Sequence, residues 1–253
     1  MEVHHPHHPT HKKKWSEYIL EFVMLFAAVT LGFFAENIRE HQVVEEHKVQ
    51  NLTAMIGDLK QDSIEINDRI EEYSNTLVQF EKIKDLSLDF QNKKLNETAY
   101  IDSVVSIYLN AKYGVGLFIN NASYKNTIAS SSLSYIENSE TKQLIAQYYE
   151  ALYGKLEVNN KILDEDANDF MAKTFTFGFL TLTDEKLKGQ TRSFASQIDD
   201  FKSIPAFRKL LTVPEFRIYV NKMEGRCGYY LYVMQMAKDL NNKLLAQLNK
   251  KEY

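Results

Sequence analysis

The chain has 253 residues, of which 44% are hydrophobic and 25% charged, and its formal net charge is −4. These proportions are typical of a folded globular chain and argue against a disordered one. The acidic balance excludes an electrostatic surface for nucleic acid, and the single Cys227 excludes an intrachain disulfide framework or a cysteine-rich metal site.

We predict that residues 1–14 form a flexible cytoplasmic tail, because Pro6 and Pro9 are incompatible with a helix there. Imidazoles at the density found in this tail could bind a divalent transition metal only weakly, since nothing holds them in a fixed geometry. We therefore interpret residues 1–14 as a solvated tail that gains charge as the pH falls toward about 6, with weak metal binding as the alternative. No cofactor is expected. The histidines concerned are His4, His5, His7, His8 and His11.

The segment from Tyr18 to Ala35 is apolar and long enough to cross a bilayer. It contains one charge, Glu21, and as a helix it covers about 27 Å, close to the thickness of a hydrocarbon core. A cleaved signal peptide has a shorter apolar region that ends in a small-x-small site. We therefore predict an uncleaved transmembrane helix over 15–36, with a cleaved signal and a buried helix of a soluble protein as the alternatives.

The flanks of this segment predict its orientation. Three lysines precede it, whereas acids outnumber bases just after it. The positive-inside rule then places the tail in the cytoplasm and residues 37–253 outside it, which in a bacterium means an inner-membrane protein with a periplasmic domain. The residues predicted to anchor the segment at the membrane interface are Lys12, Lys13, Lys14, Trp15 and Tyr18.

One stripe of this helix combines acidic and small residues. Ala28 and Gly32 form a small-xxx-small pair that permits close helix approach, and an acid in the apolar run costs a few kcal/mol unless it is protonated, paired or facing protein. We interpret the stripe as a contact face for a transmembrane helix of a partner or of a second copy. The alternatives are that Glu21 reaches the interface and the small residues have no role, or that Glu21 is a proton or cation site. The stripe comprises Glu17, Glu21, Ala28, Gly32 and Glu36.

Residues 37 to about 90 predict one long helix that continues out of the membrane, beginning with a polar, solvated stalk over 38–48. Apolar residues then recur at alternating spacings of three and four, which is a heptad seam. We expect this seam to pack against another helix of the same chain, with a homo-oligomeric coiled coil as the alternative. The seam residues are Val49, Leu52, Ile56, Leu59, Ile66, Ile70, Tyr73, Leu77 and Phe80.

The remaining sequence predicts further helices and no strand. The helices are expected over 98–113, 122–130, 140–175, around 194–201 and from 213 to about 248. Asn138 or Ser139 is a candidate N-cap, and Thr212 to Glu215 is a candidate capping box. Gly225 and Gly228 in the last helix predict close packing or a kink. The predicted fold is all-α, with one N-terminal transmembrane helix continuing into a bundle of long antiparallel helices.

Two segments together resemble a known family. They are the membrane segment Trp15–Glu36, which runs directly into a charged helix, and SYKNTIASSSLSYIENSETKQLIAQYYEAL from Ser123 to Leu152. This pattern is similar to a widespread, uncharacterised family of bacterial single-pass inner-membrane proteins with an all-helical extracytoplasmic domain. The family's usual glycine in this loop is replaced by serine in Ser130–Ser132. The resemblance implies location and shape but no activity.

No catalytic constellation is found in the sequence. No histidine follows His47, which excludes a histidine-based triad or zinc site in the folded part. The acids between Asp164 and Asp169 are interpreted as a solvated face, with a cation site as the alternative. We therefore expect a non-enzymatic structural or accessory subunit of a membrane assembly. A ligand-binding or sensory module, and an ion-coupled accessory subunit that uses Glu21, are the alternatives.

Overall fold

The computed structural model describes residues 14–111, 113–179, 202 and 205–250. Within these ranges every regular element is helical and no strand occurs, so the all-α prediction is confirmed. The helix predicted around 194–201 lies outside the described residues. The elements are α1 (Trp15–Gln91), α2 (Glu97–Asn110), α3 (Ala122–Ala129), the 3₁₀ turn η1 (Ser132–Tyr135), α4 (Ser139–Ala146), the π-helical turn η2 (Gln147–Leu152), α5 (Tyr153–Phe179), α8 (Pro205–Thr212) and α9 (Pro214–Asn249).

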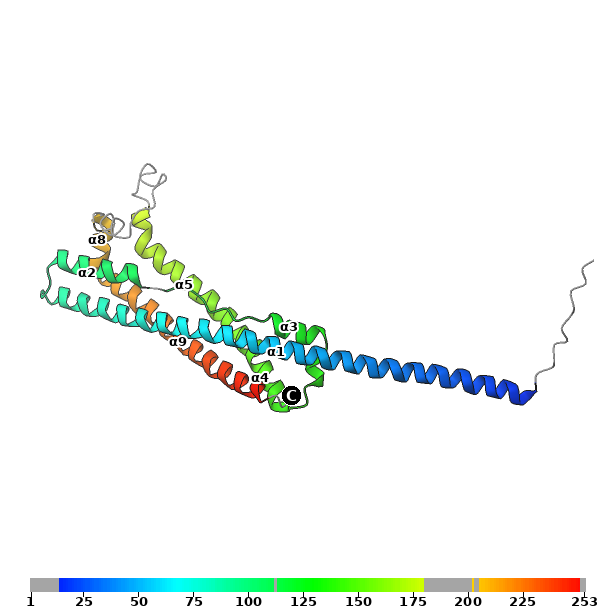
Figure 1. The fold of residues 1–253 in the computed structure, drawn as a ribbon. Coiled ribbons are helices and arrows are strands. Elements are labelled where there is room, and N and C mark those ends of the chain that lie inside the picture. Colours follow the sequence, from blue (N-terminus) through cyan, green and yellow to red (C-terminus); the bar gives the residue numbers. More distant parts are fainter. Residues whose placement is uncertain (1–13, 112, 180–201, 203–204, 251–253) are drawn as a thin grey trace, which may run out of the picture.

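Helix α1 has 77 residues and is therefore about 115 Å long. Its apolar N-terminal part projects beyond all the other described elements, and the remainder runs through the helical domain (Figure 1). The expected solvated stalk is wrong at its carboxyl end. The His41 ring already contacts the Tyr135 ring, with 5.0 Å between centroids, and Lys48 is buried and donates to the Tyr135 carbonyl over 3.3 Å. The turn η1 thus contacts α1 at His41 and at Lys48.

Helix α9 packs antiparallel along α1 and provides the partner for its heptad seam (Figure 1). One buried row of α1 repeats every seven residues, as predicted: Leu52, Leu59, Ile66, Tyr73 and Phe80. The second row differs from the prediction. It consists of Lys48, Met55, Asp62, Thr76 and Ile83, whereas Val49 is exposed and Ile56, Ile70 and Leu77 are only partly buried. The apolar periodicity predicted the wrong residues for the second row because several buried positions of that row carry polar side chains.

Helices α4 and α5 are joined through η2 into one continuous rod from Ser139 to Phe179. Its N-cap is Asn138, as expected, and the Asn138 Oδ1 accepts the Thr141 N–H over 3.0 Å. The wider π turn places the consecutive Tyr148 and Tyr149 in the core. Such turns within α-helices are frequent at functional sites.

The end of the bundle farthest from the apolar segment is closed by α2 and α8 (Figure 1). Phe90 of α1 stacks on Tyr100 of α2 with 4.5 Å between ring centroids, and the Tyr100 hydroxyl donates to the Leu211 carbonyl of α8 over 2.8 Å. The expected capping box at the start of α9 is wrong. Thr212 ends α8 and donates to the Lys209 carbonyl, so the N-cap position of α9 falls on Val213.

Candidate functional site

A non-helical strap, Tyr113–Asn121, connects α2 to α3 across the helices of the bundle. Its side chains alternate as in an extended strand. Leu117 and Ile119 are buried in the core, while Phe118 between them is 74% exposed. The strap therefore belongs to the core on one face and presents an aromatic ring to solvent on the other.

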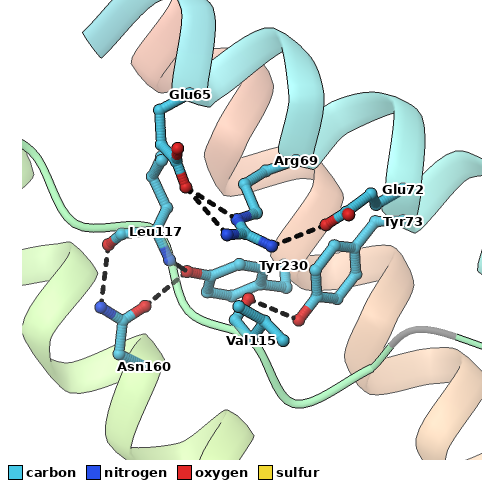
Figure 2. Close-up of polar contacts among 8 residues, drawn as sticks. All are labelled: Glu65, Arg69, Glu72, Tyr73, Val115, Leu117, Asn160 and Tyr230. Carbon is cyan, nitrogen blue, oxygen red and sulfur yellow. Dashed lines mark hydrogen bonds and ion pairs between the residues drawn. The ribbon is translucent and has the colours of Figure 1, made fainter. Parts of the chain in front are cut away.

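Polar side chains of three helices clamp the backbone of the strap (Figure 2). The Tyr230 hydroxyl of α9 accepts the Leu117 N–H and donates to Asn160 Oδ1 of α5. Asn160 Nδ2 in turn donates to the Leu117 carbonyl over 2.9 Å, so both polar groups of this buried residue are satisfied. The Tyr73 hydroxyl of α1 donates to the Val115 carbonyl, also over 2.9 Å. Burial raises the pKa of Tyr230 to about 12, which keeps its hydroxyl proton in place at neutral pH.

The two glycines of the strap permit its close approach to α5. Gly114 has φ +81°, and a Cβ there would also lie 2.8 Å from Ala167 Cβ. At Gly116 an added Cβ would lie 2.8 Å from both Cγ and Oδ1 of Asn160, the clamping residue. Glycine is therefore required at both positions for different reasons, left-handed backbone in the first case and space in the second.

Beside the clamp, Arg69 of α1 is held by ion pairs along its own helix (Figure 2). Its guanidinium bonds to Glu65 over 2.9 Å and to Glu72 over 2.6 Å. These two ion pairs neutralise the charge of Arg69, which is partly buried. Arg69 lies seven residues after Asp62 and seven before Thr76, in the same row of α1. The arrangement accounts for Arg69 as a structural residue.

A second polar centre fixes the end of the strap nearest α3. The buried carboxylate of Asp62 accepts the Asn120 N–H over 2.9 Å and the Tyr148 hydroxyl over 2.8 Å. Asn241 of α9 donates to the Tyr148 oxygen over 3.1 Å and to the Leu59 carbonyl over 3.0 Å. Burial raises the pKa of Asp62, and this effect outweighs the bonds from Asn120 and Tyr148, which act in the opposite direction.

A groove of about 480 Å³ lies between the strap and α5. Leu117, Ile119 and Leu156 supply apolar lining, and Phe118 stands beside them. The polar and charged lining residues are Asn121, Tyr153, Glu157, Asn160, Lys161, Asp164, Glu165 and Asn168. This volume lies within the range of about 300–1,000 Å³ that is usual for ligand sites.

The acids expected to form a solvated face on α5 divide into two groups. Burial opposes ionisation of Asp166, but bonds from Lys222 at 2.9 Å and Arg226 at 2.6 Å hold the pKa of this carboxyl below its usual value. Asp169 likewise pairs with Lys173 over 2.7 Å. Among the described residues no group of three or more potential ligands could hold a metal ion. Asp166 and Asp169 are therefore the paired group, and Asp166 joins α5 to α9. Asp164 and Glu165 form the other group and line the groove.

The residues predicted from the apolar segment lie on the projecting part of α1. Glu17, Glu21, Ala28, Gly32 and Glu36 are all exposed, and a Cβ added at Gly32 would meet nothing within 4 Å. An 18-residue window of this helix has a mean hydropathy of 2.0, and none of it is buried. The alternative of a buried helix in a soluble protein is therefore wrong for this structure. Glu36 pairs with Arg39 over 2.5 Å.

The predicted interface anchors are only partly described. Trp15 is 81% exposed, and Lys14 and Tyr18 are exposed as well. Lys12, Lys13 and the five tail histidines, His4, His5, His7, His8 and His11, lie outside the described residues. The described anchors therefore lie exposed at the N-terminal end of α1.

No family model, curated protein or solved structure matches this chain. The candidate sites are therefore defined by their own geometry.

Proposed function

We propose that α1 anchors the chain in a membrane and that the protein is a non-enzymatic structural or accessory subunit of an inner-membrane assembly. The observation that carries this proposal is the complete exposure of the apolar window of α1, at a mean hydropathy of 2.0. Soluble monomers rarely expose contiguous apolar patches larger than a few hundred Å². A hydrocarbon environment removes this cost, and the length of the window suits a bilayer.

The continuity of α1 supports an anchor that is retained. The same helix runs without interruption from Trp15 into the core residues that begin at Lys48. A signal peptide would instead be removed by a cut within this helix. The three lysines before the segment support a cytoplasmic tail and an outward-facing domain, and the family resemblance supports a bacterial inner membrane.

An accessory rather than catalytic role is supported by how the buried polar groups are used. Asp62, Tyr148, Tyr230 and Asn160 bond to one another, to Asn241 or to backbone groups of the strap. Each of these bonds has a structural purpose. The stripe with Ala28 and Gly32 offers a surface for lateral helix contact in the bilayer.

Size measurement in mild detergent tests this proposal. The full-length protein is purified from membranes, and Ala28→Leu is compared with Ala27→Leu, which adds the same volume about 100° away around the helix. We expect Ala28→Leu to reduce the fraction in complexes, whether with a partner or with itself, by about tenfold, corresponding to about 1.4 kcal/mol. Ala27→Leu should leave it unchanged.

Two outcomes would contradict the proposal. Recovery of an isolated monomer from wild type would refute the subunit role, and equal effects of the two leucines would refute the stripe as the contact face. Glu21→Gln in the same assay separates the roles of that acid. Complex formation is retained and cell physiology changes if Glu21 handles an ion, whereas the complex itself is lost if Glu21 makes a polar contact.

A further inference from the structure

The backbone on both sides of Phe118 is fixed by hydrogen bonds, so this residue is presented to solvent. At 74% exposure it is the most exposed large hydrophobic residue among the described residues that follow the apolar segment of α1. The backbone on either side of Phe118 cannot rotate to bury the ring. Tyr230 and Asn160 hold Leu117 on one side, and Asp62 accepts the Asn120 N–H on the other. An aromatic side chain with few rotatable bonds, carried by a fixed backbone, loses little conformational entropy on binding.

The groove next to Phe118 continues the same apolar surface. Leu117, Ile119 and Leu156 line it, and they are fixed in the core of the bundle. A volume of about 480 Å³ accommodates one large side chain and part of the backbone that carries it. The geometry suits an extended or helical segment that inserts one apolar side chain beside the phenyl ring.

The charged residues of this groove are unbalanced. Glu157, Asp164 and Glu165 line it together with a single Lys161, and no ion pair joins these four to a described residue. The situation differs for Asp166 and Asp169 further round α5, which are paired with cations. The groove thus carries a net charge of −2 beside its apolar surface. That surplus attracts cations and repels phosphate groups.

We propose that this groove docks a basic segment of a partner protein, one that places an apolar side chain against Phe118 and lysine or arginine side chains against Glu157, Asp164 and Glu165. The charge sign selects a basic peptide over an acidic one and disfavours nucleic acid and anionic lipid. The inference deepens the proposed accessory role, on which it rests for the idea that a protein partner exists. The aromatic ring supplies the contact area and the carboxylates supply selectivity.

A pair of designed peptides tests the site directly. The full-length protein is placed in nanodiscs of phosphatidylcholine, and fluorescence anisotropy reports binding of the labelled peptide Lys-Leu-Lys-Phe-Lys-Leu or of its counterpart with glutamate at each lysine position. We expect only the basic peptide to bind, and its affinity to fall as salt is raised. Phe118→Ser and Asp164→Lys should each weaken binding by about tenfold or more.

Matched substitutions elsewhere on the surface serve as controls. Val78→Ser removes an exposed apolar side chain from α1, and Glu71→Lys reverses an exposed acid on the same helix. Neither should change the affinity. Equal binding of both peptides, or equal losses from the control substitutions, would overturn the proposal.

The outcomes also separate this inference from the anchor. Absence of basic-peptide binding by a protein that inserts in the nanodisc refutes the groove alone. Peptide binding by a protein that remains outside the lipid refutes the anchor alone.

Discussion

Single polar residues in the core decide how the strap is held. Asp62 is the most consequential, because a buried carboxylate is stable only when its bonds offset the loss of hydration. Its two donors, Asn120 N–H and Tyr148 hydroxyl, come from the strap and from the π turn. One residue of α1 therefore ties together two segments that are distant in the sequence.

The raised pKa of Asp62 predicts a pH-dependent difference in stability. Because the folded-state pKa exceeds the unfolded one, the contribution of Asp62 to stability is fully present below the unfolded pKa and is lost as the pH rises through the folded one. Asp62→Asn does not ionise. Relative to wild type, its free energy of unfolding should therefore rise between pH 4 and pH 7.5, by about 1.4 kcal/mol for each unit of the shift.

Urea unfolding of the full-length protein in detergent, followed by circular dichroism, measures this difference. Thr76→Val is the matched control, since Thr76 is a buried polar residue in the same row of α1 and has no ionisable side chain. It should show no such gain. A difference between Asp62→Asn and wild type that does not change with pH would contradict the account.

Substitution of two glycines by alanine should change the stability of the protein in opposite directions. Gly116→Ala should destabilise the protein, because its Cβ would meet Asn160 at 2.8 Å and disturb the clamp. Gly225→Ala should stabilise it by about 0.5–1 kcal/mol, because Gly225 lies within α9 and a Cβ there meets nothing within 4 Å. Thermal unfolding midpoints that shift in the same direction would contradict this assignment.

At the scale of elements, the sequence was sufficient to predict the long helices but neither the short helix α8 nor the strap. The heptad row from Leu52 to Phe80 was visible because all its members are apolar or aromatic. The second row was not visible, since it contains buried polar residues: Lys48 and Asp62 bond to distant segments, and Thr76 is buried as well. The available signal for this row was its spacing, because Lys48, Asp62 and Thr76 are separated by multiples of seven residues.

The glycines show the same limit of sequence reasoning. Gly225 was expected to mark close packing or a kink, yet the structure shows open space beside it in a continuous helix. Gly114 and Gly116 lie between the helices predicted over 98–113 and 122–130, and that position alone does not indicate that they allow the strap to approach α5. Whether a glycine is needed depends on neighbours from other elements, and spacing along the chain does not contain that information.

The clamp predicts a local effect of removing one hydroxyl. Tyr230→Phe should speed hydrogen exchange in the strap, above all at the Leu117 amide, because this N–H loses its acceptor. The matched control is Tyr232→Phe, which removes a hydroxyl from an exposed ring two residues along α9. Hydrogen exchange followed by mass spectrometry measures both. Equal protection of the strap in the two variants would show that Tyr230 is not its clamp.

At the scale of the whole molecule, the helical domain begins close to the apolar segment. His41 contacts Tyr135 six residues after Ala35, which corresponds to about 9 Å along a helix. If the apolar segment spans a membrane, the end of the domain that contains η1 lies next to the headgroups, and the end with α2 and α8 lies roughly 75 Å further out. The fold then acts as a rod that holds its far end away from the membrane surface.

Cysteine labelling tests the central claim, that α1 crosses the membrane with the helical domain outside. The native chain provides a low background, because Cys227 is buried and burial raises the pKa of its thiol to about 12. A membrane-impermeant maleimide is applied to spheroplasts that carry Thr10→Cys or Asn92→Cys, and to the same cells after lysis. The account predicts labelling of Asn92→Cys in intact spheroplasts and of Thr10→Cys only after lysis. Labelling of Thr10→Cys in intact spheroplasts, or recovery of the chain in the soluble fraction, would contradict it.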